Sequence, residues 1–210
     1  MLTLSDGESE YGETLLTVPN PVTKHLYIRG IVRWLVPDPM IRDNGEDAAK
    51  KLYTRGEIGP LCEFVEKQVF PAFSWRDRRW VNELTVKTMF LSLLFNEVNY
   101  LMASERETRS GYADLAMIVR PDRRKYRLLD ILIEFKFIRP KELKLAKEQL
   151  REKTDQELLK LDKIRKKVES AKEQAARYSA DLRAEFGDFI SLKTFTVIAV
   201  GFERILWEPV

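Results

Sequence analysis

Cysteine and histidine are nearly missing from this sequence, which holds only Cys62 and His25 in 210 residues. A single cysteine excludes an intramolecular disulfide, which fits a reducing compartment such as the cytoplasm. Zinc sites need several thiolate or imidazole ligands, so a zinc centre of the usual kind is also excluded. A serine-type triad is not supported either, because no G-x-S-x-G elbow accompanies the histidine. We interpret Cys62 as a small core residue and His25 as a helix-surface or capping residue.

Long apolar runs and a strong charge of one sign are missing as well. No apolar run approaches the roughly 20 residues that span a bilayer, and the start, MLTLSDGESEYGE, lacks the regions of a signal peptide. The chain has only 9 glycines and no Gly-Lys dipeptide, which excludes a P-loop. Its 36 basic residues nearly cancel 33 acidic ones, so the net charge of +3 neither requires nor excludes a polyanionic partner. We expect a soluble, cytoplasmic protein without a membrane partner.

The first third of the chain is predicted to be helical. Residues 1–18 are too polar to pack and are expected to form a frayed segment. The remainder, 19–210, is expected to be one domain with a helical part over 19–76 and an α/β core over 77–210. Apolar spacing predicts helices over 22–36, 45–54 and 57–70, and a longer, buried helix from Arg78 to about Asn96 that Asp77 would cap.

The second half alternates strands with one long helix. Strands are expected at 99–104, twice within 111–137, and at 193–202, where the apolar character of both faces indicates a central strand, parallel to a neighbour. A charged segment over 141–186, almost free of helix breakers, lies before the last strand. The predicted fold class is therefore α/β with a mixed sheet: helix, three-stranded meander, helix and strand, preceded by extra N-terminal helices.

The long charged helix carries a heptad seam of apolar residues at alternating spacings of 3 and 4. Its members are Leu161, Ile164, Val168, Ala171, Ala175, Tyr178 and Leu182. The later half is expected to pack on the sheet. The earlier half, up to about Lys167, is polar enough to project into solvent or to pair with another chain, so a homodimer through this helix is one hypothesis.

The stretch 111–137, GYADLAMIVRPDRRKYRLLDILIEFKF, is where charge meets the predicted core. Strand side chains alternate between faces, so Glu134 and Lys136 are expected to point the same way. A carboxylate and an ammonium are costly on a central strand unless they bind each other, a metal or a substrate. Asp114, at the start of the neighbouring strand, would add a third charge.

Such a group suits metal-assisted chemistry at phosphorus. Mg²⁺ is commonly held by one or two carboxylates together with waters and substrate phosphate. A lysine beside them can serve the attacking water or balance charge on the phosphorane, which indicates phosphodiester hydrolysis. Glu83, early in the preceding helix, would add a carboxylate, although it could equally form an ordinary i,i+4 pair with Lys87.

These motifs resemble those of the PD-(D/E)XK nuclease superfamily, and in particular a branch whose nuclease module often follows an AAA-ATPase-like domain. The matching residues are Val18-Pro19-Asn20, Asn82-Glu83-Leu84, Ser104-Glu105-Arg106-Glu107, Gly111-Tyr112-Ala113-Asp114, Glu134-Phe135-Lys136 and Gln174-Ala175-Ala176-Arg177-Tyr178. Ala113 stands where the superfamily's name has proline. The chain holds no ATPase-like domain, and the spacing after Lys136 suggests a helical insertion around 143–165.

The resemblance implies a restriction-endonuclease-like core and a Mg²⁺-dependent nuclease, with Mn²⁺ as a substitute. By position, Asp114, Glu134 and Glu83 would bind the metal, Lys136 would serve the attacking water, and Gln174 would orient the site. DNA is favoured over RNA as substrate, and a separate ATPase-like partner is open. The alternative is a catalytically silent nucleic-acid-binding or assembly module. Candidate contacts to nucleic acid are Arg106, Arg109, Arg123, Arg124, Lys125 and Tyr178.

Overall fold

A computed structural model describes residues 3–8, 14–17, 21–74, 76 and 80–210 of the chain. Two short strands come first, β1 (Thr3–Glu8) and β2 (Thr14–Thr17), followed by the helices α1 (Pro21–Leu35), α2 (Pro39–Arg55), α3 (Gly59–Phe64) and α4 (Glu83–Leu93). The main sheet and its helices then follow as β3 (Tyr100–Thr108), β4 (Gly111–Val119), β5 (Asp130–Ile138), α5 (Pro140–Leu143), α6 (Lys147–Glu152), α7 (Asp155–Leu159), α8 (Asp162–Phe186), β6 (Leu192–Val200) and β7 (Arg204–Pro209).

The main sheet has five strands in the order β3-β4-β5-β6-β7. Strands β5 and β6 are parallel, while the other neighbours are antiparallel. The sheet is thus mixed, and the predicted α/β class with a helix, a three-stranded meander, a helix and a strand is confirmed. The edge strand β7 was not predicted, because it is short and its residues Arg204 and Glu208 leave it little apolar alternation.

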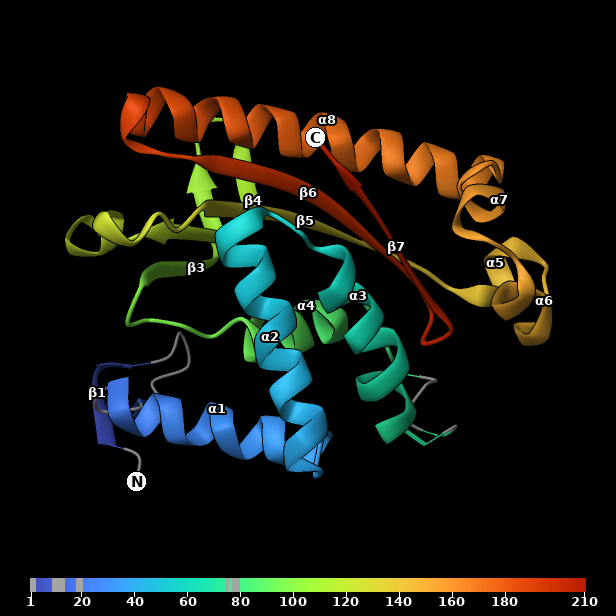
Figure 1. The fold of residues 1–210 in the computed structure, drawn as a ribbon, viewed down its shortest axis with the longest axis horizontal. Helices are drawn as coiled ribbons and strands as arrows, with labels where there is room; N and C mark the ends of the chain where they lie inside the picture. The colour runs from blue at the N-terminus through green and yellow to red at the C-terminus, as the bar shows by residue number, and fades with distance from the viewer. Residues whose placement is uncertain (1–2, 9–13, 18–20, 75, 77–79) are drawn as a thin grey trace.

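Helices cover both faces of this sheet (Figure 1). The long helix α8 lies along one face, while α2, α3 and α4 lie on the other, with α1 beyond them. The larger core cluster joins the α2–α4 side to one set of strand side chains, including Ile133 and Phe135. A second cluster joins Tyr178 and Leu182 of α8 to the opposite set, including Leu132. Alternation along β5 therefore turns Glu134 and Lys136 toward α8.

Local sequence signals explain where the early helices begin. Helix α2 starts at Pro39 instead of residue 45, because Asp38 caps it by accepting the N–H of Met40 and proline suits the first helical turn. Helix α4 starts at Glu83 and not at Arg78, because Asn82 forms a reciprocal cap with Thr85. The predicted cap Asp77 lies outside the described residues.

Two parts of the stretch 1–18, which was expected to be frayed, form the strands β1 and β2. Strands β1 and β2 pair in an antiparallel manner as a small separate sheet. The Val18-Pro19-Asn20 motif lies outside the described residues. Within the ranges that the structure covers, no helix is long and apolar enough to cross a membrane.

The charged segment after β5 is broken into short helices before α8 begins. Lys144 takes a left-handed conformation after α5, and Thr154 starts α7 with a capping box to Glu157. These short helices, α5–α7, lie at one end of the sheet (Figure 1). Their apolar side chains Leu150 and Leu158 pack on the early half of α8.

The heptad seam is used inside the chain. Its members from Ile164 to Leu182 are all buried, the early ones against α6, α7 and the sheet. The early half of α8 does not project freely into solvent, because the short helices before it provide the apolar partners of Ile164 and Val168; pairing with a second copy stays a prediction. A homodimer through this seam would have to break that packing.

Candidate active site

The site forms where β4 and β5 separate, beyond the pair Leu115 and Ile133, and we call this place the fork. These strands pair only over residues 115–117 and 131–133, after which β4 continues beside β3 and β5 continues beside β6. Asp114 and Glu134 occupy the next position on each strand. The backbone N–H of Phe135 has no strand partner on the β4 side at this fork, and it donates to Asp114 Oδ2 at 2.8 Å. The carboxylate is therefore held in place by the sheet itself.

Glu134 is the most deeply buried acid of the group. Its side chain is 4 % exposed, and its Oε1 accepts a hydrogen bond from Lys136 Nζ at 2.7 Å. Its other oxygen, Oε2, is buried without a hydrogen-bond partner. Burial and the negative charge of Asp114 outweigh the help of Lys136 and raise the pKa of Glu134 from 4.5 to about 7. The carboxylate is thus short of positive charge, which a cation would supply.

Lys136 is predominantly an ammonium at neutral pH. Burial works against its charge, but the hydrogen bond and charge of Glu134, with smaller contributions from Glu83 and Asp114, raise its pKa above 10.5. The predicted common face of Glu134 and Lys136 is confirmed by their contact. In this state Lys136 can donate hydrogen bonds and stabilise negative charge.

Two side chains of α4 approach from the other side of the sheet. Glu83 is half-buried in the first turn of α4, and its negative charge helps to raise the pKa of Lys136. Lys87 is buried and contacts Asp114 Oδ1 at 3.3 Å and also Glu105 of β3. The ordinary Glu83–Lys87 helix pair is therefore replaced by bonds from Lys87 to the sheet. Sequence reasoning missed this role of Lys87, although its place in a buried helix was a signal.

Helix α8 closes the site from the opposite face. Gln174 is half-buried, and its Oε1 is buried without a hydrogen-bond partner. Tyr178 packs so closely on β4 that a Cβ on Gly111 would lie 3.2 Å from its hydroxyl. Burial and then the charge of Glu134 raise the pKa of Tyr178. Both predicted α8 residues thus lie on the side facing the sheet.

The predicted basic contacts fall into two places. Arg106 and Arg109 lie at the end of the β3–β4 hairpin, near Gly111. Arg106 bonds to Glu185 and lies over Phe186, while the hairpin turn is held to α8 by the N–H of Ser110 donating to Asp181. Arg106 pairs with Ala113 and so lies next to the fork, whereas Arg109 lies beyond the last pair of the hairpin, Thr108 with Gly111.

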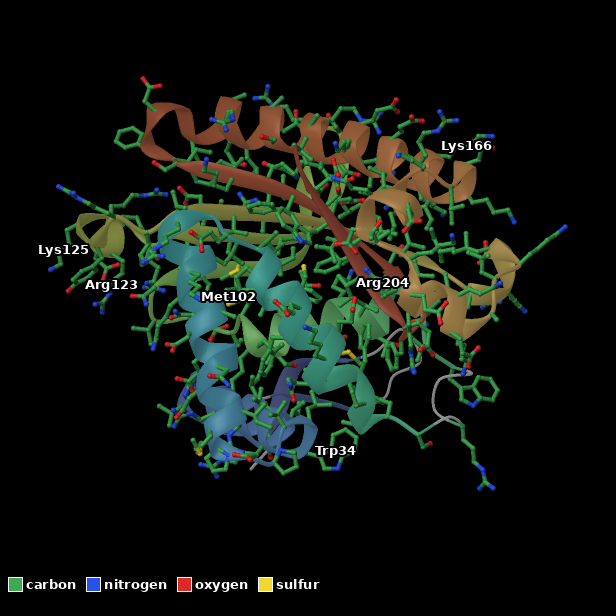
Figure 2. All side chains as sticks on the ribbon, turned by 45° about the vertical axis from the view of Figure 1, so that its right-hand side comes forward. Trp34, Met102, Arg123, Lys125, Lys166 and Arg204 are labelled. Atoms are coloured by element: carbon green, nitrogen blue, oxygen red, sulfur yellow. The ribbon has the colours of Figure 1, made fainter. Side chains whose placement is uncertain are left out.

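The other basic residues lie at the far end of β4. Val119 and Asp114 are five strand residues apart, about 17 Å, and the turn Pro121–Tyr126 follows beyond Val119. Arg123 and Lys125 project there (Figure 2). Arg124 instead donates two hydrogen bonds, of 2.7 and 2.9 Å, to the carboxylate of the fully buried Asp130. The structure thus gives Arg124 a stabilising role, and this basic turn is not beside the carboxylates.

A divalent cation fits the fork as a partly hydrated ion. No three acidic, histidine or cysteine side chains gather into a ready-made ligand group in the part of the chain that the structure covers. Mg²⁺, however, commonly takes one or two protein carboxylates and completes its shell with water and phosphate. Asp114 and Glu134 provide two such carboxylates, and the unpaired Oε2 of Glu134 is a hard oxygen donor of the type that this ion prefers.

Comparison with known families gives a match over the same region. The profile of a family described as the PD-(D/E)XK nuclease superfamily matches residues 81–204, more than half of the chain. The matched span runs from α4 to the start of β7 and includes every side chain placed at the fork. Comparison with curated proteins and with solved structures gave no match.

Proposed function

Because the chain belongs to the PD-(D/E)XK nuclease superfamily, we propose that it is a metal-dependent DNA endonuclease that uses Mg²⁺ at the β4–β5 fork. The observation that supports this most directly is the buried, unpaired oxygen of Glu134 beside Asp114. A buried acid whose pKa is raised to about 7 destabilises the fold when it ionises, and such costs occur most often where the group binds a ligand. A bound cation would offset that cost.

Each residue has a role that follows from its surroundings. Asp114 and Glu134 hold the cation, which when bound stabilises the negative charge that builds on the phosphate oxygens. Lys136, charged and fixed by Glu134, donates a hydrogen bond to the attacking water and stabilises the phosphorane. Glu83 adds a carboxylate from α4, and Gln174 offers an amide from α8 that orients the group.

The test uses variants that keep the fold. Asp114→Asn removes the charge but leaves an oxygen to accept the Phe135 N–H, and Lys136→Met removes the ammonium at similar volume. We expect cleavage of supercoiled circular DNA with Mg²⁺ or Mn²⁺ in the unmodified protein and at least about a hundredfold loss in each variant. Glu173→Gln, an exposed acid on α8, is the matched control. Cleavage that persists in both variants would refute the assignment.

DNA and RNA are separated in the same assay. Single- and double-stranded oligonucleotides of one sequence are offered as DNA and as RNA, and we expect DNA to be cut faster. Circular substrates report endonuclease activity, because an enzyme that needs a free end leaves them intact.

A second candidate function is a binding or assembly module without turnover. It is favoured by the ammonium groups that already accompany both carboxylates, Lys87 at Asp114 and Lys136 at Glu134. Such a module would retain DNA in a salt-dependent manner and release no products with any metal. Products that require Mg²⁺ would exclude it.

A further inference from the structure

The Lys87 ammonium occupies an unusual position for a lysine. It is 5 % exposed on a helix whose neighbouring residues Val86, Met89 and Phe90 are buried in the core. A buried ammonium is costly unless carboxylates compensate it. Its two partners are Asp114, which the proposed function makes a metal ligand, and Glu105 of β3.

Glu105 is presented to Lys87 by a break in the β3–β4 ladder. Pairing runs through Ser104 with Leu115 and resumes at Arg106 with Ala113, so Glu105 and Asp114 face each other at the one unpaired level. Glu105 has φ of 57°, which is strained for a residue with a side chain. Glu105, Asp114 and Glu134 therefore lie at one level across three neighbouring strands.

Both oxygens of Asp114 accept a hydrogen bond from the protein. Oδ2 accepts from the backbone N–H of Phe135, while Oδ1 accepts from Lys87 at 3.3 Å. The backbone bond can remain when a cation arrives, since it belongs to the fork. The bond from Lys87 cannot, because an ammonium and a divalent cation on the same oxygen repel each other.

We propose, on the basis of the function above, that Lys87 is a positioning residue that holds Asp114 Oδ1 until the divalent cation displaces it toward Glu105. Lys87 and Glu105 together then set the affinity of the fork for the cation. The formal charges agree with this role. Glu83, Glu105, Asp114 and Glu134 against Lys87 and Lys136 leave −2, which a divalent cation neutralises.

This arrangement makes opposite predictions for the two partners. Lys87→Met removes the competing charge and should tighten metal binding about tenfold. Glu105→Gln removes the second acceptor, leaves Lys87 on Asp114, and should weaken metal binding about threefold, the smaller figure because Glu105 is exposed and screened. In the double variant Lys87 is gone and Glu105 has no ammonium to accept, so the affinity should match that of Lys87→Met; an affinity midway between the single variants would indicate two independent charges and overturn the displacement. If Lys87 only stabilised the fold, metal binding would be weaker in both Lys87→Met and Glu105→Gln.

The experiment titrates the full chain with MnCl₂ or MgCl₂ alone, without nucleic acid, in an isothermal calorimeter at pH 8. Lys67→Met is the matched control, because Lys67 forms an exposed ion pair with Glu63 remote from the fork, and its affinity should not change. Thermal melts show that each variant is folded. If Lys87→Met does not fold, Glu105→Gln decides alone: an unchanged or tighter affinity overturns the proposal.

The outcomes separate this inference from the proposed function. Metal binding by the unmodified chain together with unchanged or weaker binding by Lys87→Met overturns the role of Lys87 and leaves the nuclease proposal standing. No metal binding by the unmodified chain overturns both. Tighter binding by Lys87→Met with weaker binding by Glu105→Gln supports the displacement.

Discussion

Replacing Glu134 with glutamine should make the metal-free protein more stable at alkaline pH. The folded pKa of about 7 lies above the ordinary 4.5, so the folded chain keeps the proton over an interval in which the unfolded chain has released it. The stability of the unmodified protein therefore falls as pH rises from 4.5 through 7, and the full cost is present at pH 8. At 1.36 kcal/mol per pH unit, that cost is about 3 kcal/mol.

Glutamine resembles the protonated carboxyl group and can still accept the hydrogen bond from Lys136. Glu134→Gln should thus be about 2–3 kcal/mol more stable than the unmodified chain at pH 8 in EDTA, a rise of roughly 4–12 °C in Tm for a chain of this size. At pH 4.5 the difference should vanish. Differences between the two proteins at each pH remove the contributions of all other titrating groups.

The ranking should reverse when a divalent cation is added. Mg²⁺ at one thousand times its Kd stabilises the unmodified protein by about 4.1 kcal/mol, more than the lead of the variant in EDTA, whereas the variant, short of one ligand, gains little. Melts by circular dichroism from pH 4.5 to 8, with EDTA and with Mg²⁺, measure both effects, and Glu173→Gln serves as the exposed control. A Glu134→Gln protein that melts at or below the unmodified one at pH 8 in EDTA would refute the reasoning.

Two further predictions concern the scaffold. Arg124→Met should lower the free energy of unfolding in urea by about 3 kcal/mol, because it leaves the fully buried Asp130 without its guanidinium partner. The control Arg123→Met should change that free energy by less than about 0.5 kcal/mol. Equal effects of the two variants would contradict the structural role of Arg124. Ile164→Glu should lower the free energy of unfolding by more than about 3 kcal/mol, because it places a charge in the core, and it should leave the molecular mass measured by light scattering unchanged. If the unmodified protein is a dimer and Ile164→Glu turns it into a stable monomer, the helix-pairing hypothesis is supported instead.

Local periodicity was enough to predict the central strands and the common face of Glu134 and Lys136. Alternation with period two is a property of any strand, so the side on which each residue lies follows once a strand is assigned. The apolar run of β5 also indicated a central, covered position, as its burial confirms. The superfamily resemblance is confirmed, while the association with an ATPase-like domain stays a prediction.

Long-range geometry could not be predicted in the same way. The fork between β4 and β5 depends on where two ladders stop, which no short motif encodes. Lys87 was considered only as a partner of Glu83, because helix spacing relates residues four apart but does not show which strand faces them. The packing partners of the heptad seam could not be predicted either, because an apolar seam can pack equally well on a helix of the same chain or on a helix of a second chain.

The length of α8 has a consequence for how this scaffold can vary. Its 25 residues extend about 37 Å, whereas the nine residues of β6 extend only about 30 Å, so the helix overhangs the sheet on which it rests. The short helices before it cover that overhang. A relative that loses them should carry an α8 shorter by about one or two turns, or exchange Ile164 for a polar residue, so the two lengths should change together.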